Sequence, residues 1–229
     1  MSGRSQHYIP ASFLGRFSHD SERRMRERLV WALQQAQPSA QLLAAERLGA
    51  EINFYKLFGQ QTFGGTLNVV DDVWAGYERR LIRALDELSN PRGTTSINAT
   101  TWLRTLVPFV ASLFVRGKEF RERFQTRLDR VGAGGAFGDD QHRSDNVNMA
   151  RLFEFQRLLA PTMAARWVVM HTDNSHPVIT SELGFTFSVS RAGDQAIVVP
   201  VGPECILAVV PTWPRGRVIL RDGGTGQWR

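Results

Sequence analysis

The stretch that organises the chain reads Gln6-His7-Tyr8-Ile9-Pro10-Ala11-Ser12-Phe13-Leu14-Gly15-Arg16-Phe17. Pro10 suits the first turn of a helix, where the missing N–H of proline costs nothing. The spacing of Phe13, Leu14 and Phe17 gives the residues after Pro10 one apolar face. We therefore expect this end of the chain to be docked on the rest, with His7 and Tyr8 held at the entrance of a helix.

The composition of the chain is that of an ordinary folded domain, with an unusual choice of cation. Its 229 residues fit a single domain, and 42% hydrophobic residues are enough for a core. The net charge is +6, and among the 28 basic residues only Lys56 and Lys118 are lysines. Arginine forms planar, bidentate contacts with phosphate or carboxylate. The alternative explanation is the mutational bias of a GC-rich genome, which replaces lysine by arginine.

The single cysteine, Cys205, lies in the apolar run Cys205–Val210 and is expected to be a small core residue. No disulfide framework is possible, so a reducing cytoplasm is the expected setting. The N-terminus lacks an apolar signal segment. The longest apolar run, Leu106–Val115, is shorter than the roughly 20 residues of a membrane helix. We expect a cytoplasmic protein with no membrane partner.

Helical periodicity predicts three main helices. The first begins at Asp71 or Asp72 and ends at Asn90-Pro91, and the second runs from about Asn98 to Arg130, with Thr100 or Thr101 as its cap and a kink at Pro108. The third runs from Asn146 to about Ala165. Between the last two, a Gly/Asp-rich segment at about 132–146 predicts a mobile loop.

Strands are predicted mainly after the helices. Apolar runs broken by Gly, Pro, Asn and Asp indicate an antiparallel sheet built from residues 167–170, 178–181, 185–187, 196–201 and 205–210, with a last short strand at 218–220. Before the helices, Leu29–Leu33 is predicted as a strand, although propensity also allows a helix from Glu22 to Gln35. Residues 37–49 are predicted as a loop with one helical turn. The expected fold class is α+β, with a helical core and a C-terminal antiparallel sheet in one domain over residues 1–229.

Several short motifs, in this order, resemble the bacterial family catalogued as domain of unknown function 4238. They are His7-Tyr8-Ile9-Pro10, Phe54-Tyr55, Glu78, Arg116, Val178-Ile179-Thr180-Ser181-Glu182 and Val199-Pro200-Val201-Gly202-Pro203. Ser181-Glu182 stands where the family usually has Ser-Asp, and the Asn-Pro that follows there is missing. The resemblance implies an architecture and a candidate site, but the family has no established reaction.

The resemblance implies that His7, Tyr8, Glu78, Arg116 and Ser181-Glu182 form one site. Such a site would hold a general acid/base, a phenol, a cation and carboxylates. It could cleave a phosphodiester, because the histidine can move a proton while the arginine stabilises developing negative charge. The alternative is a buried polar cluster that pins the N-terminus to the helices, since buried polar groups must be paired.

A second candidate feature is the basic stretch Arg116–Arg130. Arg121, Arg123 and Arg127 are predicted to bind substrate phosphates, with Phe120 and Phe124 available to stack on bases. The alternative is that both phenylalanines face the core while the charges, which include Glu119 and Glu122, form a solvated surface.

A third feature is His171-Thr172-Asp173-Asn174-Ser175-His176, where two histidines and one aspartate could hold a metal. The same residues equally predict a hairpin turn, and we predict no metal or cofactor. Phosphate-loop, nucleophile-elbow and zinc motifs are absent from the sequence. Two functional hypotheses remain: a phosphoester- or nucleic-acid-processing enzyme, and a non-catalytic module that binds nucleic acid or a protein. The expected partner is a nucleic acid or another phosphate-bearing ligand.

Overall fold

The computed structural model describes residues 5–33, 37–58, 68–90, 97–132, 140–172, 177–189 and 195–211. In it the N-terminal stretch forms β1 (Ser5–His7), α1 (Ala11–Leu14) and the 3-10 turn η1 (Gly15–Phe17), with Pro10 at the start of α1. Phe13 is completely buried, and Arg16 Nε donates to the carbonyl of Val201 at 2.6 Å. The N-terminal stretch is therefore docked on the body of the protein, as the sequence predicts.

Two small antiparallel pairs follow the N-terminal stretch. β1 pairs with β4 (Ala50–Ile52), and β2 (Leu29–Ala32) pairs with β3 (Gln41–Ala44). The 3-10 turns η2 (Met25–Glu27) and η3 (Ala45–Arg47) flank the β2–β3 hairpin. The strand predicted around Trp31 is confirmed, whereas the loop predicted at 37–49 also contains β3. Gln41-Leu42-Leu43-Ala44 lacks the β-branched and aromatic residues by which strands are recognised.

The first main helix, α2 (Val69–Ser89), is confirmed. It begins two residues before Asp71, so Asp71 and Asp72 lie in the first turn, where acids interact well with the helix dipole. Its buried face carries Trp74, Tyr77, Leu81 and Leu85 among others, at helical spacing.

The second predicted helix is divided. α3 (Ala99–Thr101), one π-helical turn (Trp102–Leu106) and α4 (Val107–Arg116) are followed, after Gly117, by a separate helix α5 (Lys118–Arg130). Asn98 caps the start, because its side chain accepts from Thr100 N at 2.8 Å. Pro108 lies in the first turn of α4 and is tolerated there. The extended backbone of Gly117 ends α4, so the prediction of one helix to Arg130 is wrong.

The third helix, α6 (Asp140–Ala164), begins six residues before Asn146 and continues past Pro161. Of the segment predicted as a mobile loop, residues 140–146 are therefore helical, and residues 133–139 lie outside the described part of the chain.

The C-terminal sheet has the strand order β5-β8-β7-β6 and is antiparallel throughout. Its strands are β5 (Arg166–His171), β6 (Thr186–Val189), β7 (Gln195–Gly202) and β8 (Cys205–Val210). Cys205 is buried, as predicted. Residues 178–181 form no strand: Val178 N donates to Pro203 O at 2.7 Å, and Gly184 N closes a turn onto Ser181 O at 3.0 Å. The strand predicted at 218–220 lies outside the described residues.

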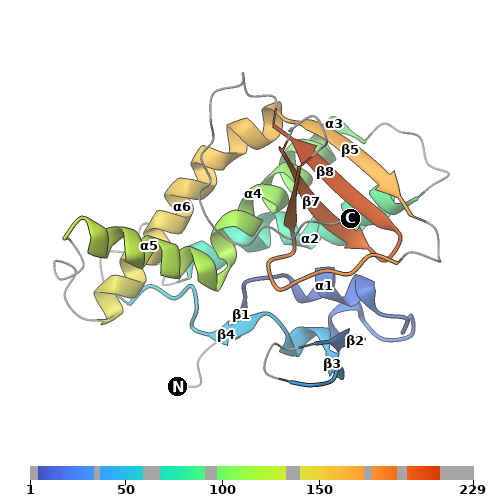
Figure 1. The fold of residues 1–229 in the computed structure, drawn as a ribbon, viewed down its shortest axis with the longest axis horizontal. Helices are drawn as coiled ribbons and strands as arrows, with labels where there is room; N and C mark the ends of the chain where they lie inside the picture. The colour runs from blue at the N-terminus through green and yellow to red at the C-terminus, as the bar shows by residue number, and fades with distance from the viewer. Residues whose placement is uncertain are drawn as a thin grey trace.

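Figure 1 shows how these parts are arranged. Helices α2 and α4 lie against the sheet, and their apolar faces share one core with the inner sheet residues Val199, Leu207 and Val209. The N-terminal strands run below the helices, and α5 extends with the start of α6 away from the sheet. This arrangement confirms the α+β class. In the described ranges, no helix is long and apolar enough to cross a membrane.

Candidate functional site

A pocket of about 530 Å³ lies beside β1, between the first half of α2 and the turns η2 and η3. Its walls carry one histidine, three arginines and three acids, which are His7, Arg26, Arg47, Arg116, Glu46, Asp71 and Glu78. The structure thus brings together three residues predicted for the site, His7, Glu78 and Arg116. It adds Arg26, Glu46, Arg47 and Asp71, which the sequence did not indicate as site residues.

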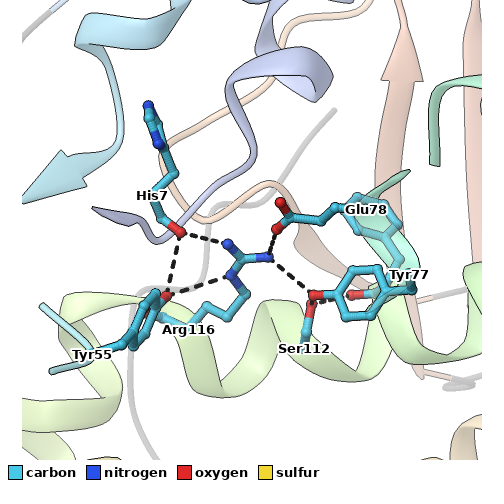
Figure 2. A network of polar contacts seen from close by, with 7 residues as sticks. His7, Tyr55, Tyr77, Glu78, Ser112 and Arg116 are labelled. Atoms are coloured by element: carbon cyan, nitrogen blue, oxygen red, sulfur yellow. Dashed lines mark hydrogen bonds and ion pairs between the residues drawn. The ribbon is translucent and has the colours of Figure 1, made fainter. Parts of the chain in front are cut away.

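Arg116, at the end of α4, is the centre of a buried polar network (Figure 2). Its side chain is 2% exposed. Nη1 donates to Tyr77 Oη at 3.0 Å and to the Glu78 carboxylate, Nη2 donates to the carbonyl of His7, and Nε donates to Tyr55 Oη at 3.4 Å. These bonds use one N–H on Nε, two on Nη1 and one on Nη2 of the five that a guanidinium carries. Arg116 is therefore held in place by four separate groups.

The charges around Arg116 keep it ionised. Burial lowers the pKa of Arg116, but the Glu78 carboxylate together with the Tyr77 and Tyr55 side chains outweighs this effect and holds the pKa well above its ordinary value. Burial also raises the pKa of Tyr77 to about 12, so Tyr77 keeps its proton and donates it to Ser112 Oγ at 2.6 Å. Ser112 Oγ in turn donates to the carbonyl of Phe109 at 2.7 Å. Both hydroxyl donors, those of Tyr77 and Ser112, therefore have an acceptor.

His7 contacts Arg116 through its backbone and not through its ring. Figure 2 shows the imidazole pointing away from the guanidinium, and its Nε2 lies 3.0 Å from the carbonyl oxygen of Glu46. A carbonyl can only accept, so Nε2 carries the proton and Nδ1 of the neutral ring keeps a free lone pair. Burial lowers the pKa of His7, although the Glu46 carbonyl opposes this. The ring is therefore neutral near pH 7 and able to accept a proton.

Tyr8 does not line this pocket. Its ring packs against Phe54 at a centroid distance of 5.6 Å, and Lys118 Nζ lies 5.3 Å from the ring centre. Burial raises the pKa of Tyr8. Two residues that are adjacent in the sequence thus have different surroundings, and the structure does not bring the phenol to the imidazole.

Ser181 and Glu182 are also outside the pocket. Both are exposed, and Ser181 Oγ accepts from Leu183 N at 3.3 Å within its own turn. Glu182 lies near Tyr8, and its negative charge is one of those that raise the pKa of Tyr8. We call this side of β1, which Tyr8 faces, the Tyr8 side. The convergence of Ser181-Glu182 with His7 and Arg116, which the family resemblance implied, is not seen.

Of the α5 arginines predicted to bind substrate, Arg121 lies on the Tyr8 side as well. Arg121 pairs with Glu51 at 3.6 Å and covers the Phe54 ring at 4.7 Å. Arg123 Nε donates to a carbonyl of its own helix, and Arg127 is exposed. Neither of these two lines the pocket.

The two phenylalanines of α5 are stacked, with their ring centres 6.2 Å apart and an interplanar angle of 11°. They are Phe120 and Phe124, and Phe120 packs against the core.

A second buried arginine, Arg151 on α6, was not predicted. It is 0% exposed and donates to the carbonyls of Val115 at 2.8 Å and Gly117 at 3.1 Å, and to Asn148 Oδ1 at 2.7 Å. Burial lowers the pKa of Arg151 to about 10. Arg151 caps the carbonyl end of α4, where a cation suits the helix dipole. Its place at helical spacing from Phe155 was the one signal in the sequence that it faces the core.

Only His171 of the three predicted metal ligands lies in the part of the chain that the structure describes. His171 is exposed at the end of β5, while Asp173 and His176 lie outside the described residues. Over the described ranges, no three His, Cys, Asp or Glu side chains cluster as metal ligands do.

The comparison with known proteins identifies a family without identifying a reaction. The model of the family described as "Protein of unknown function (DUF4238)" matches residues 5–218. This confirms the family that the sequence motifs indicated. No curated protein and no solved structure matches the chain. The function has to be inferred from the geometry of the pocket.

Proposed function

The chain belongs to the DUF4238 family, and we propose that it is a phosphoester-processing enzyme whose reaction takes place in the pocket beside β1. The observation that carries this proposal is the state of His7. Its ring is neutral, Nε2 is held by the Glu46 carbonyl, and Nδ1 is left as a proton acceptor in a pocket that also contains Arg26, Arg47 and Arg116. A fixed base next to cations is what phosphoester cleavage requires.

In the proposed reaction, His7 Nδ1 takes the proton of an attacking water or hydroxyl. The oxygen of that nucleophile forms the new bond to phosphorus, and the bond from phosphorus to the leaving oxygen breaks. The imidazolium then returns the proton to the leaving oxygen. The Glu46 carbonyl stabilises the charged ring through the Nε2–H bond.

The three arginines of the pocket have different roles in the proposed reaction. Arg47 is exposed, and among the described residues it forms no ion pair, so it is available to a phosphate oxygen. Arg26 pairs with Glu46 at 3.2 Å and can share its charge with the substrate. Arg116 is occupied by four bonds and acts as a positioning residue, because it holds the backbone of His7.

The proposal is tested with a panel of substrates and one pair of variants. The substrates are bis(p-nitrophenyl) phosphate, single-stranded RNA, single-stranded DNA and nucleotides. His7→Gln keeps a donor for the Glu46 carbonyl but removes the base, whereas His19→Gln changes an exposed histidine that does not line the pocket. We expect His7→Gln to lower kcat/KM by about 100-fold or more, with an unchanged melting temperature, and His19→Gln to match wild type. Equal activity of all three proteins, or no turnover of any substrate by wild type, contradicts the proposal.

A second candidate is a non-catalytic module that binds a phosphate-bearing ligand. It is favoured by the Arg116 network, in which four N–H groups of Arg116 and the hydroxyls of Tyr77 and Ser112 donate to other groups of the protein. In this case calorimetry detects binding of an oligonucleotide while no product forms over hours.

A further inference from the structure

The β2–β3 hairpin carries an apolar surface that faces away from the core. Trp31 and Leu42 are directly opposite each other in the strand register. They are 68% and 47% exposed, and Leu33, just beyond β2, is 72% exposed. Val30, which directly precedes Trp31, is buried. The alternation of strand side chains therefore puts Trp31 on the face opposite the buried Val30. Figure 1 shows β2 and β3 at the bottom of the molecule.

The hairpin is built directly on the wall of the pocket. The turn η2 leads into β2 and the turn η3 follows β3, and Arg26 of the first turn pairs with Glu46 of the second at 3.2 Å. Both of these residues line the pocket. Trp31 follows Arg26 by five residues, which limits their separation to roughly 18 Å. A chain molecule bound in the pocket can thus reach Trp31.

The base of the hairpin is positively charged. The flanking segments 24–28 and 45–47 contain four arginines, Arg24, Arg26, Arg28 and Arg47, against two glutamates. One of these glutamates, Glu46, is already paired with Arg26. An exposed aromatic ring beside a cluster of arginines is the combination that binds single-stranded nucleic acid, since bases stack on the ring while phosphates contact the arginines.

We propose that the hairpin is a stacking platform for single-stranded nucleic acid, in which a base stacks on Trp31 while the phosphate of a neighbouring nucleotide occupies the pocket. This inference rests on the proposed function, because it names the substrate class of the same pocket. Leu33 and Leu42 flank the ring and exclude water from the stacked base. Arg47 and Arg26 contact the backbone of the strand.

The test compares two ligands and three proteins. One ligand is a fluorescent single-stranded DNA oligonucleotide, and the other is the same oligonucleotide with abasic sites, which keeps the phosphates but offers nothing to stack. The proteins are wild type, Trp31→Ala and Phe153→Ala, the last because Phe153 is equally exposed, at 62%, on α6. We expect Trp31→Ala to weaken binding of the normal oligonucleotide about 5- to 150-fold, the range of one base–aromatic stack. Its affinity for the abasic ligand should equal that of wild type, and Phe153→Ala should bind both ligands as wild type does.

Three results overturn the inference. One is equal affinity of wild type and Trp31→Ala for the normal oligonucleotide. Another is a wild-type dimer in sedimentation that Trp31→Ala dissociates, which makes this face an interface between two copies of the chain. The third is a Trp31-dependent affinity for anionic phosphatidylserine vesicles without one for DNA. Turnover of bis(p-nitrophenyl) phosphate by wild type, measured in parallel, tests the proposed function separately, so failure of the platform and failure of the enzyme give different patterns.

Discussion

The two sides of β1 differ in how their charges are held. On the pocket side, Arg116 is buried, ionised and fixed by Tyr55, Tyr77, Glu78 and the backbone of His7. On the other side, Tyr8 is half-buried among exposed or partly exposed charges, of which Lys118 and Arg121 share Glu51. The first side is a rigid frame around a pocket, and the second is a solvated surface.

This difference teaches that neighbours in sequence need not share a site. His7 and Tyr8 are adjacent, yet the first is turned toward Glu46 and the second toward Phe54. His7 pairs with Ala50 in the register of β1 with β4, and Tyr8, just beyond β1, donates its N–H to Gly49 O at 2.8 Å, so the two successive side chains face opposite sides of this extended segment. The pocket side therefore has the fixed geometry that a reaction needs, and changes there should have larger effects than equivalent changes on the Tyr8 side.

The largest effect on stability is expected from Arg116→Met. The substitution leaves the Tyr77 hydroxyl and the His7 carbonyl without their donor and removes the partner of Glu78, so unfolding free energy should fall by about 3–5 kcal/mol. The matched change on the other side, Arg121→Met, removes a partly exposed pair with Glu51 and should cost no more than about 1 kcal/mol. Urea denaturation measures both values. Equal losses of unfolding free energy would mean that the arginines on the two sides of β1 stabilise the fold equally, which contradicts the prediction.

A smaller effect is expected from removing one hydroxyl on each side. Tyr77→Phe removes the acceptor of Arg116 and the donor to Ser112, both of which are buried, and should cost about 1–3 kcal/mol. Tyr8→Phe should change the stability by no more than about 0.5 kcal/mol, because no hydrogen bond of its hydroxyl is seen within the described ranges. Thermal unfolding of both variants checks this ordering, and a Tyr8→Phe variant as unstable as Tyr77→Phe would reverse it.

The pH dependence of stability sharpens the comparison further. The pKa of His7 is lowered by folding, so below its ordinary value of 6.5 the unfolded chain takes up the proton first and stability falls. Above pH 6.5 this loss is absent, and the loss is complete below the lowered pKa of the folded state. His7→Gln should therefore lose less stability than wild type between pH 7 and pH 5, whereas His19→Gln should follow wild type. Unfolding curves at both pH values measure the difference.

Much of the fold follows from local patterns in the sequence. The periodicity of Trp74, Tyr77 and Leu81 predicts α2, and the apolar runs at 196–201 and 205–210 predict β7 and β8. The division of the second helix could not be predicted from a local pattern. The carbonyls at the end of α4 are bonded by Arg151, a residue more than thirty positions away. Residues 178–181 have the composition of a strand, but their backbone bonds go to Pro203 and into a turn.

The site was predictable only where the family motif marked it. His7, Glu78 and Arg116 were grouped by their resemblance, and the structure brings them to one pocket. Arg26 and Glu46 could not be found in this way, because their pairing depends on the β2–β3 hairpin that separates them in sequence. Tyr8 and Glu182 were grouped with His7 although the orientation of each depends on tertiary contacts that no local pattern encodes.

The measurement that tests the central claim most directly is the pH profile of kcat/KM for hydrolysis of bis(p-nitrophenyl) phosphate between pH 4.5 and pH 8. If neutral His7 is the base, the wild-type profile should fall on the acid side with a midpoint below 6.5. His7→Gln should be about 100-fold or more slower and should lack this midpoint. A wild-type profile without an acid limb, or a His7→Gln variant that retains it, would contradict the claim.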